Sequence, residues 1–252
     1  MMDMNEFTDK VVLITGAGRG AGRQIALAFS SLGAVMAAND INPISLDETI
    51  SLLQQAGGKA GAYVFDIAKR MPIEGLVAQV LEHFGHIDVL VNHAAVQPDA
   101  SLLEMDEWDF HRTLDVNLGG PFFTMQQVGR VMRQQGGGAI VNLISAADHE
   151  RIKKGHAAHS ASQAGVMALT HAAASELAEY HIRVNSVLFG CMEIGLIPAQ
   201  EWDKAAFHHW RAAVPNVGAG EYQDLVRMVL FLCSNAASSL TGLVIPVERG
   251  EQ

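Results

Sequence analysis

Short apolar runs alternate along the chain with longer stretches in which apolar residues recur at helical spacing. The short runs are rich in Val, Ile and Leu, which is the pattern of β-strands. Runs without polar alternation are typical of strands that are buried on both faces of a parallel sheet. The pattern predicts seven strands, at Lys10–Thr15, Ala34–Asp40, Ala60–Asp66, Ile87–Asn92, Gly138–Ser145, Ile182–Leu188 and Leu243–Val247.

The stretches between these strands predict helices, and the longest of them contains Pro121, where we expect a kink or break because proline lacks the backbone N–H. Alternation of strand and helix predicts an α/β fold, namely a single Rossmann-type domain over residues 1–252 with a doubly wound parallel sheet of about seven strands and helices on both faces. Residues 190–220 show no clean period and are predicted to form a lid over a substrate. The predicted helices are Ala21–Leu32, Ser45–Ala56, Ile73–Phe84, Met105–Gln135 and His159–Tyr180.

Composition narrows the functional class. Charged residues make up 17% of the chain and hydrophobic residues 49%, which is the reverse of a disordered protein. The net charge of −10, without a basic cluster, argues against binding to nucleic acid, whose phosphates need neutralising. We expect neither a signal peptide nor a membrane span. The two cysteines, Cys191 and Cys233, cannot form a disulfide framework, so a reducing, cytoplasmic compartment is expected.

A glycine-rich turn follows the first predicted strand and opens the first predicted helix. Residues 15–22 read TGAGRGAG. Glycines here permit a tight turn and let backbone N–H groups approach a pyrophosphate at the helix N-terminus. The turn therefore predicts a dinucleotide site, with contacts from Gly16, Gly18, Arg19, Gly20 and Gly22.

Asp40 ends the second predicted strand, where a carboxylate can accept hydrogen bonds from the adenosine ribose. Because a carboxylate repels a 2′-phosphate, Asp40 favours NAD over NADP, although Arg19 in the turn would suit a phosphate. Five further residues are predicted to contact the cofactor. They lie at or just after the ends of other predicted strands, or on the helix after the fifth strand: Asp66, Ile67, Asn92, Ala94 and Gln163.

Over nearly its whole length the sequence resembles the short-chain dehydrogenase/reductase family. Besides the glycine turn, Asp40 and the turn at Asp66, the segments that carry the resemblance are VNHAA (91–95), DVNLGGPF (115–122), GAIVNLIS (138–145), HSASQ (159–163), IRVNSVLFG (182–190) and LTGLVIPVERG (240–250). The resemblance implies a nicotinamide cofactor, a small-molecule substrate and a homodimer or homotetramer. It also implies acid–base work by a Tyr-x-x-x-Lys pair together with a Ser and an Asn.

The match at the catalytic positions is incomplete. Ser145 stands at the family's serine and Asn117 at its asparagine, but His159 occupies the tyrosine position and Gln163 the lysine position. The four-residue spacing of the pair on one helix face survives. The family's Asn-Asn-Ala-Gly turn is also altered, with His93 at its second position.

The paired replacement is chemically coherent. A tyrosine titrates near pH 10 and needs a neighbouring ammonium to act near neutrality, whereas a free histidine titrates at about 6.5. We therefore predict that His159 is the general acid/base, that Ser145 binds the substrate oxygen and that Asn117 positions a water or the helix backbone. Gln163 would bond a ribose hydroxyl or orient the imidazole. The imidazole nitrogen lies nearer the backbone than a tyrosine oxygen by roughly 2 Å, which has a cost in positioning.

Two alternatives stay open at this point. The site could bind NAD or a substrate and carry out non-redox lyase or isomerase chemistry with His159 as base. The chain could also be a catalytically silent dinucleotide-binding member, because fold does not determine chemistry. We expect no metal site, since the His156–His159 pair, with His149 upstream, has no acidic or cysteine partner at ligand spacing.

Overall fold

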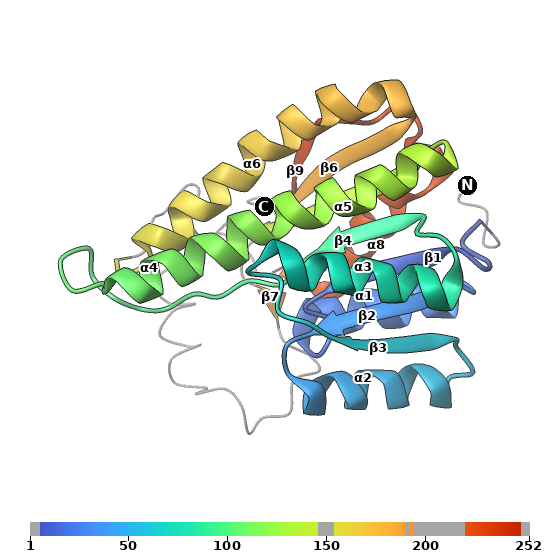
Figure 1. Ribbon diagram of the computed structural model, residues 1–252, viewed down its shortest axis with the longest axis horizontal. Coiled ribbons are helices and arrows are strands. Elements are labelled where there is room, and N and C mark those ends of the chain that lie inside the picture. The colour runs from blue at the N-terminus through green and yellow to red at the C-terminus, as the bar shows by residue number, and fades with distance from the viewer. Residues whose placement is uncertain (1–5, 146–153, 190–191, 194–219, 248–252) are drawn as a thin grey trace.

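A computed structural model describes residues 6–145, 154–189, 192–193 and 220–247 of the chain (Figure 1). Its centre is a parallel sheet of seven strands in the order β3-β2-β1-β4-β5-β6-β9. Two-residue strands, β7 (Met192–Glu193) and β8 (Gly220–Glu221), pair separately. The strands of the main sheet are β1 (Val11–Thr15), β2 (Val35–Asp40), β3 (Ala60–Val64), β4 (Val89–Asn92), β5 (Gly138–Ser145), β6 (Ile182–Phe189) and β9 (Val244–Val247).

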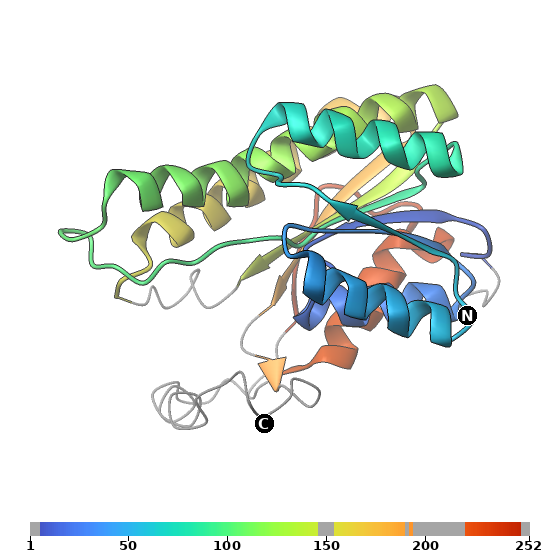
Figure 2. The ribbon, with the colours of Figure 1, turned by 60° about the horizontal axis from the view of Figure 1, so that its bottom comes forward.

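Helices cover both faces of this sheet, as Figures 1 and 2 show. One face carries α1 (Gly20–Ser31), α2 (Pro43–Gln55) and α8 (Tyr222–Cys233), and the other carries α3 (Arg70–Phe84), α5 (Gly120–Gln135) and α6 (Ala157–Leu177). The alternate residues of β1 enter two different cores: Val12 and Ile14 pack with α1 and α8, while Val11 and Leu13 pack with α3 and α5. Burial on both faces explains why this strand has no polar alternation.

The structure confirms the predicted α/β class, the doubly wound sheet and the seven strands, with shifts at their ends. One shift concerns the site: β3 ends at Val64, so Asp66 lies two residues beyond the strand and does not end it. The reason is the register, since Val64 pairs with Asp40, the last residue of β2, and no partner strand remains beyond it.

The predicted long helix from Met105 to Gln135 is not broken but runs from Glu107 to Gln135, and its hydrogen-bond pattern changes just before the proline. It consists of α4 (Glu107–Leu114), a π-helical turn (Asp115–Gly119) and α5, with Pro121 in the first turn of α5. Proline lacks the N–H that would donate to the preceding turn, and the π-helical turn accommodates it without ending the helix. This turn contains Asn117, one of the predicted catalytic residues.

Sequence reasoning missed α8, although Leu225, Val229 and Leu232 recur at helical spacing and are fully buried. The predicted lid at 190–220 lies outside the described residues except for β7 and Gly220. None of the described helices is long and apolar enough to cross a membrane.

Candidate functional site

The order of the strands reverses between β1 and β4, and this is where open α/β sheets bind ligands, beyond the carboxyl ends of the strands. Here the glycine turn after β1 packs against the backbone that follows β4. A Cβ on Gly16, whose φ is +70°, would lie 2.8 Å from the Cα of Ala94. A Cβ on Gly22 would lie 2.2 Å from the carbonyl oxygen of Gly16. The turn therefore admits no side chain at these two positions.

The first helix leaves its N-terminus open to an anion. Arg19 stands at the N-cap without a side-chain hydrogen bond to the helix, and the first turn of α1 holds no acidic residue. The N–H groups at a helix start lack intrahelical partners and attract negative charge. This uncapped end, which follows a glycine-rich turn, fits the pyrophosphate of a dinucleotide.

The side chain of Asp40 is held against the glycine turn by two backbone hydrogen bonds. Its Oδ2 accepts from the backbone N–H of Gly18 at 2.9 Å, and its Oδ1 accepts from the N–H of Asn42 at 2.9 Å. Each carboxylate oxygen can accept more than one hydrogen bond. The carboxylate is thus held at the glycine turn with capacity left for hydroxyl donors.

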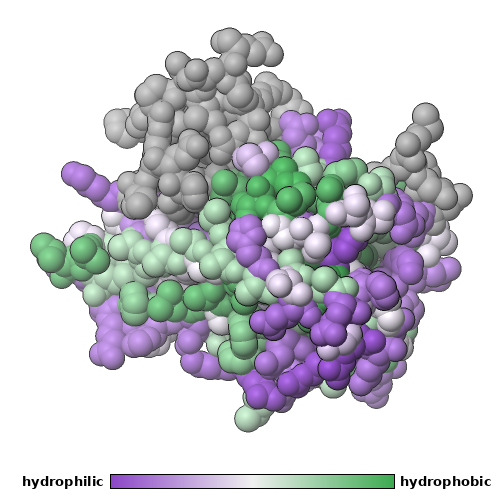
Figure 3. Space-filling model, turned by 90° about the horizontal axis from the view of Figure 1, so that it is seen from above, coloured by the Kyte–Doolittle hydropathy of each residue, from purple (hydrophilic) through white to green (hydrophobic). Residues whose placement is uncertain are grey.

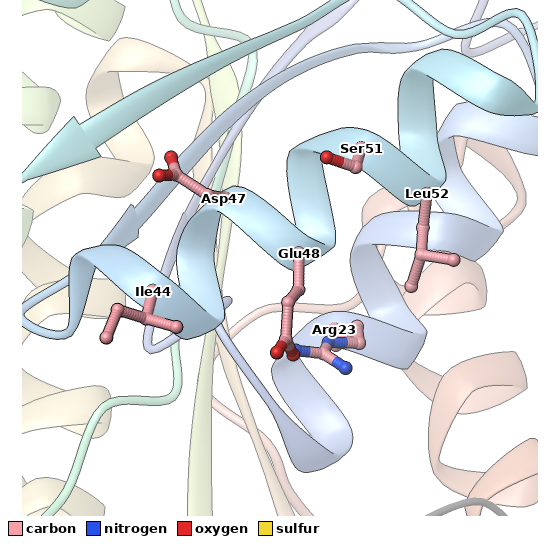
Figure 4. A pocket seen from close by; sticks show the side chains of 6 residues that line it. All are labelled: Arg23, Ile44, Asp47, Glu48, Ser51 and Leu52. Carbon is pink, nitrogen blue, oxygen red and sulfur yellow. The ribbon is translucent and has the colours of Figure 1, made fainter.

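Arg23, which sequence reasoning missed, holds this turn in place through hydrogen bonds. Its guanidinium donates to the carbonyl of Gly18 through both Nε and Nη2, and to Thr49 Oγ1 at 2.9 Å. It also pairs with Glu48 at 2.9 Å across a shallow depression between α1 and α2, where Figure 4 shows the two side chains pointing toward one another. Arg23 therefore ties the glycine turn to α2.

Asp66 and Ile67 are both engaged by the protein itself. Arg112 of α4 donates to both oxygens of Asp66, at 2.7 and 3.2 Å, and the N–H of Ala68 donates at 2.9 Å. Burial alone would raise the pKa of Asp66, but the bonds from Arg112 and Ala68 and the charge of Arg112 outweigh it and hold that pKa below its ordinary value. Ile67 is buried in a small cluster with Val116. The predicted cofactor contacts of these residues remain predictions.

Asn92 and His93 support the site from the end of β4. Asn92 is buried, donates to Asn142 at 2.9 Å and accepts from Thr124 at 2.7 Å, so its side chain holds β4 to β5 and α5. His93 Nδ1 lies 3.0 Å from the carbonyl oxygen of Gly16. Burial lowers the pKa of His93, and the neighbouring Arg19 adds to this, while the hydrogen bond to Gly16 and the Asp40 charge oppose it.

At the other end of this edge, the structure joins Asn117 to His159. The amide of Asn117 exchanges two hydrogen bonds with the backbone of Val96, both at 2.8 Å, and its Nδ2 lies 3.1 Å from Nδ1 of His159. The backbone bonds fix the orientation of the amide. Asn117 can therefore orient the imidazole, which is only 4% exposed.

Ser145 and Gln163 form the second pair. The amide oxygen of Gln163 accepts from the backbone N–H of Ser145 at 2.7 Å, which ties α6 to the end of β5. His159 and Gln163 are four residues apart on α6, so the residues at all four predicted catalytic positions are connected by hydrogen bonds or by one helix turn.

Two further residues lie at this cluster and were not predicted. Ser162 contacts Asn117, with 3.1 Å between its Oγ and Asn117 Nδ2. Gln97 lies 2.7 Å from Nδ1 of His156, whose ring packs edge to face against His159 with centroids 6.4 Å apart. These contacts join elements distant in the sequence, so no local motif could have revealed them.

Comparison with known proteins places this chain in a family. Residues 16–251 match the family profile described as enoyl-(acyl carrier protein) reductase. An uncharacterized oxidoreductase of Thermotoga maritima is 34% identical over 248 residues, covering 97% of this chain and 98% of the relative. The chain belongs to the short-chain dehydrogenase/reductase family.

Other members of this family extend the likeness. The 3-oxoacyl-[acyl-carrier-protein] reductase FabG of Thermotoga maritima is 35% identical over 241 residues, covering 96% of this chain and 97% of the relative. The crystal structure of NAD+-bound xylitol dehydrogenase superimposes with a TM-score of 0.88 at 31% identity and covers 97% of this chain and 100% of that one. Short-chain dehydrogenases/reductases are oxidoreductases that bind nicotinamide cofactors.

Proposed function

We propose that this short-chain dehydrogenase/reductase is an NAD-dependent oxidoreductase that interconverts an alcohol and a carbonyl, with His159 as the general acid/base. One observation carries the proposal: the side chain of Asn117, fixed on the backbone of Val96, holds Nδ1 of His159 at 3.1 Å. An imidazole oriented in this way presents its other nitrogen in a defined direction, as a general acid/base requires.

The preference for NAD rests on Asp40. Its carboxylate is held at the glycine turn by the N–H of Gly18 at 2.9 Å, and a carboxylate in this place accepts from free ribose hydroxyls and repels a 2′-phosphate. Arg19 is exposed and its side chain does not cap the helix, so Asp40 is the better-anchored charge.

The remaining residues divide the work at the substrate. When bound, the nicotinamide exchanges a hydride with the substrate carbon. His159 gives a proton to the substrate oxygen or takes one from it, and it needs no ammonium at position 163 because an imidazole titrates near neutral pH. Ser145 supplies a hydroxyl for the substrate oxygen. The amide oxygen of Gln163 is engaged by Ser145, which leaves its NH2 group for a ribose hydroxyl.

Titration with NAD, NADH and NADPH, followed by a panel of alcohols and ketones scored by nicotinamide absorbance, tests the proposal. We expect NADH to bind more tightly than NADPH and at least one substrate to be turned over. Tight NADH binding without any turnover would instead favour non-redox chemistry or a silent binding protein, and tighter NADPH binding would overturn the cofactor assignment.

The double variant His159→Tyr, Gln163→Lys provides a matched control, because it restores the pair that the family uses. If the scaffold keeps the geometry of hydride transfer, this variant gains or retains turnover on the same panel. A variant that binds NADH as tightly as wild type but remains inactive, beside an inactive wild type, would contradict the redox proposal.

We also propose that the chain assembles as a homodimer or homotetramer through the side that carries α4 to α6. Large apolar side chains are exposed there: Leu103 is 91% exposed in the loop before α4, and Trp108 is 70% exposed on α4. Figure 3 shows hydrophobic side chains over the α6 face and at this projecting loop. An exposed apolar face of this kind is typical of an interface.

Light scattering tests the assembly. We expect a dimer or tetramer for the wild type and a smaller species for Trp108→Glu. The control is Met71→Glu, which changes an 81% exposed side chain at the start of α3 and should leave the assembly intact. A monomeric wild type would contradict the proposal.

A further inference from the structure

The amide of Asn117 has one orientation, and this limits what its nitrogen can do. Its Oδ1 accepts from the N–H of Val96 and its Nδ2 donates to the carbonyl of Val96, both at 2.8 Å. In the reversed orientation, the NH2 group would face the N–H of Val96 and the amide oxygen would face the Val96 carbonyl, so neither hydrogen bond could form. One of the two Nδ2 protons is therefore committed to Val96, and only the second is available to other partners.

That second proton has two acceptors at equal distance. Nδ1 of His159 and Oγ of Ser162 each lie 3.1 Å from Nδ2 of Asn117. Ser162 is fully buried, and its own proton goes to the carbonyl of His159 at 2.6 Å, so its lone pairs remain able to accept. Asn117 can donate to one acceptor or share the proton between both, but it cannot bond each of them fully.

The two arrangements correspond to two forms of His159. If Asn117 donates to Nδ1, the neutral imidazole carries its proton on Nε2. If Asn117 donates to Ser162, Nδ1 is released and can carry a proton, for which the carbonyl of Val96 at 3.3 Å is an acceptor. In that second form, Nε2 carries the lone pair and can act as a base. When Nε2 accepts a proton, the resulting imidazolium keeps the hydrogen bond from Nδ1 to the carbonyl of Val96.

We propose that Ser162 is a positioning residue that lets Asn117 release His159 into the form with a proton on Nδ1. This inference rests on the proposed acid–base role of His159. A proton leaving a substrate hydroxyl goes to Nε2, while Nδ1–H stays on Val96 and the second proton of Asn117 stays on Ser162. Without the hydroxyl of Ser162, Nδ1 of His159 is the remaining acceptor for that proton.

Among the described residues, the ring of His156 packs edge to face against that of His159. Nε2 of Gln97 lies 2.7 Å from Nδ1 of His156. Asn117, Val96 and Ser162 contribute no charge.

Nitrogen NMR of histidine-labelled protein tests the inference directly, with His159→Ala used to assign the signals. In Ser162→Ala we expect the population of His159 with a proton on Nδ1 to fall about five- to tenfold, which is the effect of one hydrogen bond. Turnover should fall by a similar factor through kcat, with KM nearly unchanged. Ser162→Thr keeps the hydroxyl and should behave as wild type.

Ser160→Ala is the matched control, because the Ser160 hydroxyl lies two residues away on α6 and has no hydrogen-bond partner among the described residues. It should leave the form of His159 unchanged. If Ser162→Ala does not fold, Ser162→Cys replaces it, and its weaker acceptor should give an intermediate shift.

The NMR measurement needs neither cofactor nor substrate, so the two proposals fail separately. If the wild type turns over no substrate but Ser162→Ala shows the expected NMR shift, the proposed function is wrong and the role of Ser162 stands. An active enzyme in which Ser162→Ala changes neither the form of His159 nor kcat overturns the inference and leaves the proposed function standing.

Discussion

The two ends of the carboxyl edge of the sheet differ in how they keep or change the family pattern. At the cofactor end, the glycine turn and Asp40 are retained, and a Cβ on Gly22 would meet backbone at 2.2 Å. At the proposed reaction end, His159 and Gln163 stand where the resemblance implies the Tyr-x-x-x-Lys pair, and they are 4% and 6% exposed and hydrogen-bonded.

The difference shows that the two tasks make different demands on the chain. Dinucleotide binding depends on backbone shape, which leaves no freedom at the glycines. Acid–base chemistry depends on a side chain with a suitable pKa and orientation, which a different residue can supply if new partners hold it. The reaction end can therefore change without disturbing the cofactor end.

Among the variants at the cofactor end, Gly22→Ala should weaken NADH binding most. The new methyl group would force the turn away from the carbonyl oxygen of Gly16, and overpacking of this kind costs about 1–3 kcal/mol, or up to about 100-fold in NADH affinity. Calorimetric titration with NADH measures this. Gly129→Ala is the control, since its Cβ would make an ordinary contact at 3.6 Å with Leu177. Unchanged NADH affinity in Gly22→Ala would refute the account of the turn.

Asp40→Ala should reverse the cofactor preference. Loss of the hydrogen bonds to the ribose should weaken NADH binding about tenfold, while NADPH binding should not weaken, because the repulsion of its phosphate is removed. Affinities for both cofactors are measured side by side. Asp47→Ala removes the same charge from the exposed surface of α2 and should change neither. An equal loss for both cofactors would contradict the assignment of Asp40.

Asp66→Asn tests how much the Asp66 carboxylate contributes to the stability of the fold. Since the pKa of Asp66 is lowered, ionised Asp66 stabilises the fold above the ordinary carboxylate pKa of about 4, and this is lost as the pH falls through the lowered value. The pair with Arg112 is partly exposed, so we expect a loss below about 1 kcal/mol at neutral pH. Urea unfolding of both proteins measures it, and the difference should vanish in acid.

The control for this experiment is Asp9→Asn, because Asp9 pairs with Lys59 at 3.1 Å with both side chains about three-quarters exposed. It should leave stability unchanged at either pH. A difference between wild type and Asp66→Asn that persists in acid would show that the pair with Arg112 is not its source.

His93→Asn should have the smallest effect. Burial lowers the pKa of His93, so the fold keeps this ring neutral and is most stable above the ordinary histidine pKa of about 6.5. As the pH falls below that value, the unfolded chain binds the proton first and wild-type stability declines. Thermal unfolding as a function of pH should therefore be flatter in His93→Asn, and equal slopes would contradict this role.

The fold could be predicted from local pattern because each strand that is buried on both faces is a short apolar run in the sequence. The run from Val11 to Ile14 is apolar throughout, and its alternate residues face two cores. The end of β3 could not be predicted in the same way, because the end of β2 at Asp40 determines it through the register. Helix α8 was missed despite its buried apolar spacing, since it follows a segment without a clean period.

The candidate site was predictable where it follows a motif and not where it depends on contacts across the fold. Asn117, Ser145, His159 and Gln163 were predicted from the family positions at which they stand, and their catalytic roles remain proposals. Nothing near Arg23 in the sequence indicates that it holds the carbonyl of Gly18. The bonds of these side chains depend on the packing of distant elements, which no local spacing records.

The most direct test of the account compares hydride transfer and NADH binding in wild type and His159→Ala, on a substrate that the wild type turns over. We predict that kcat falls at least about 100-fold, as expected for loss of a general acid/base, while NADH affinity changes less than about twofold. A His159→Ala enzyme with unchanged kcat would contradict the assignment of His159 as the acid/base.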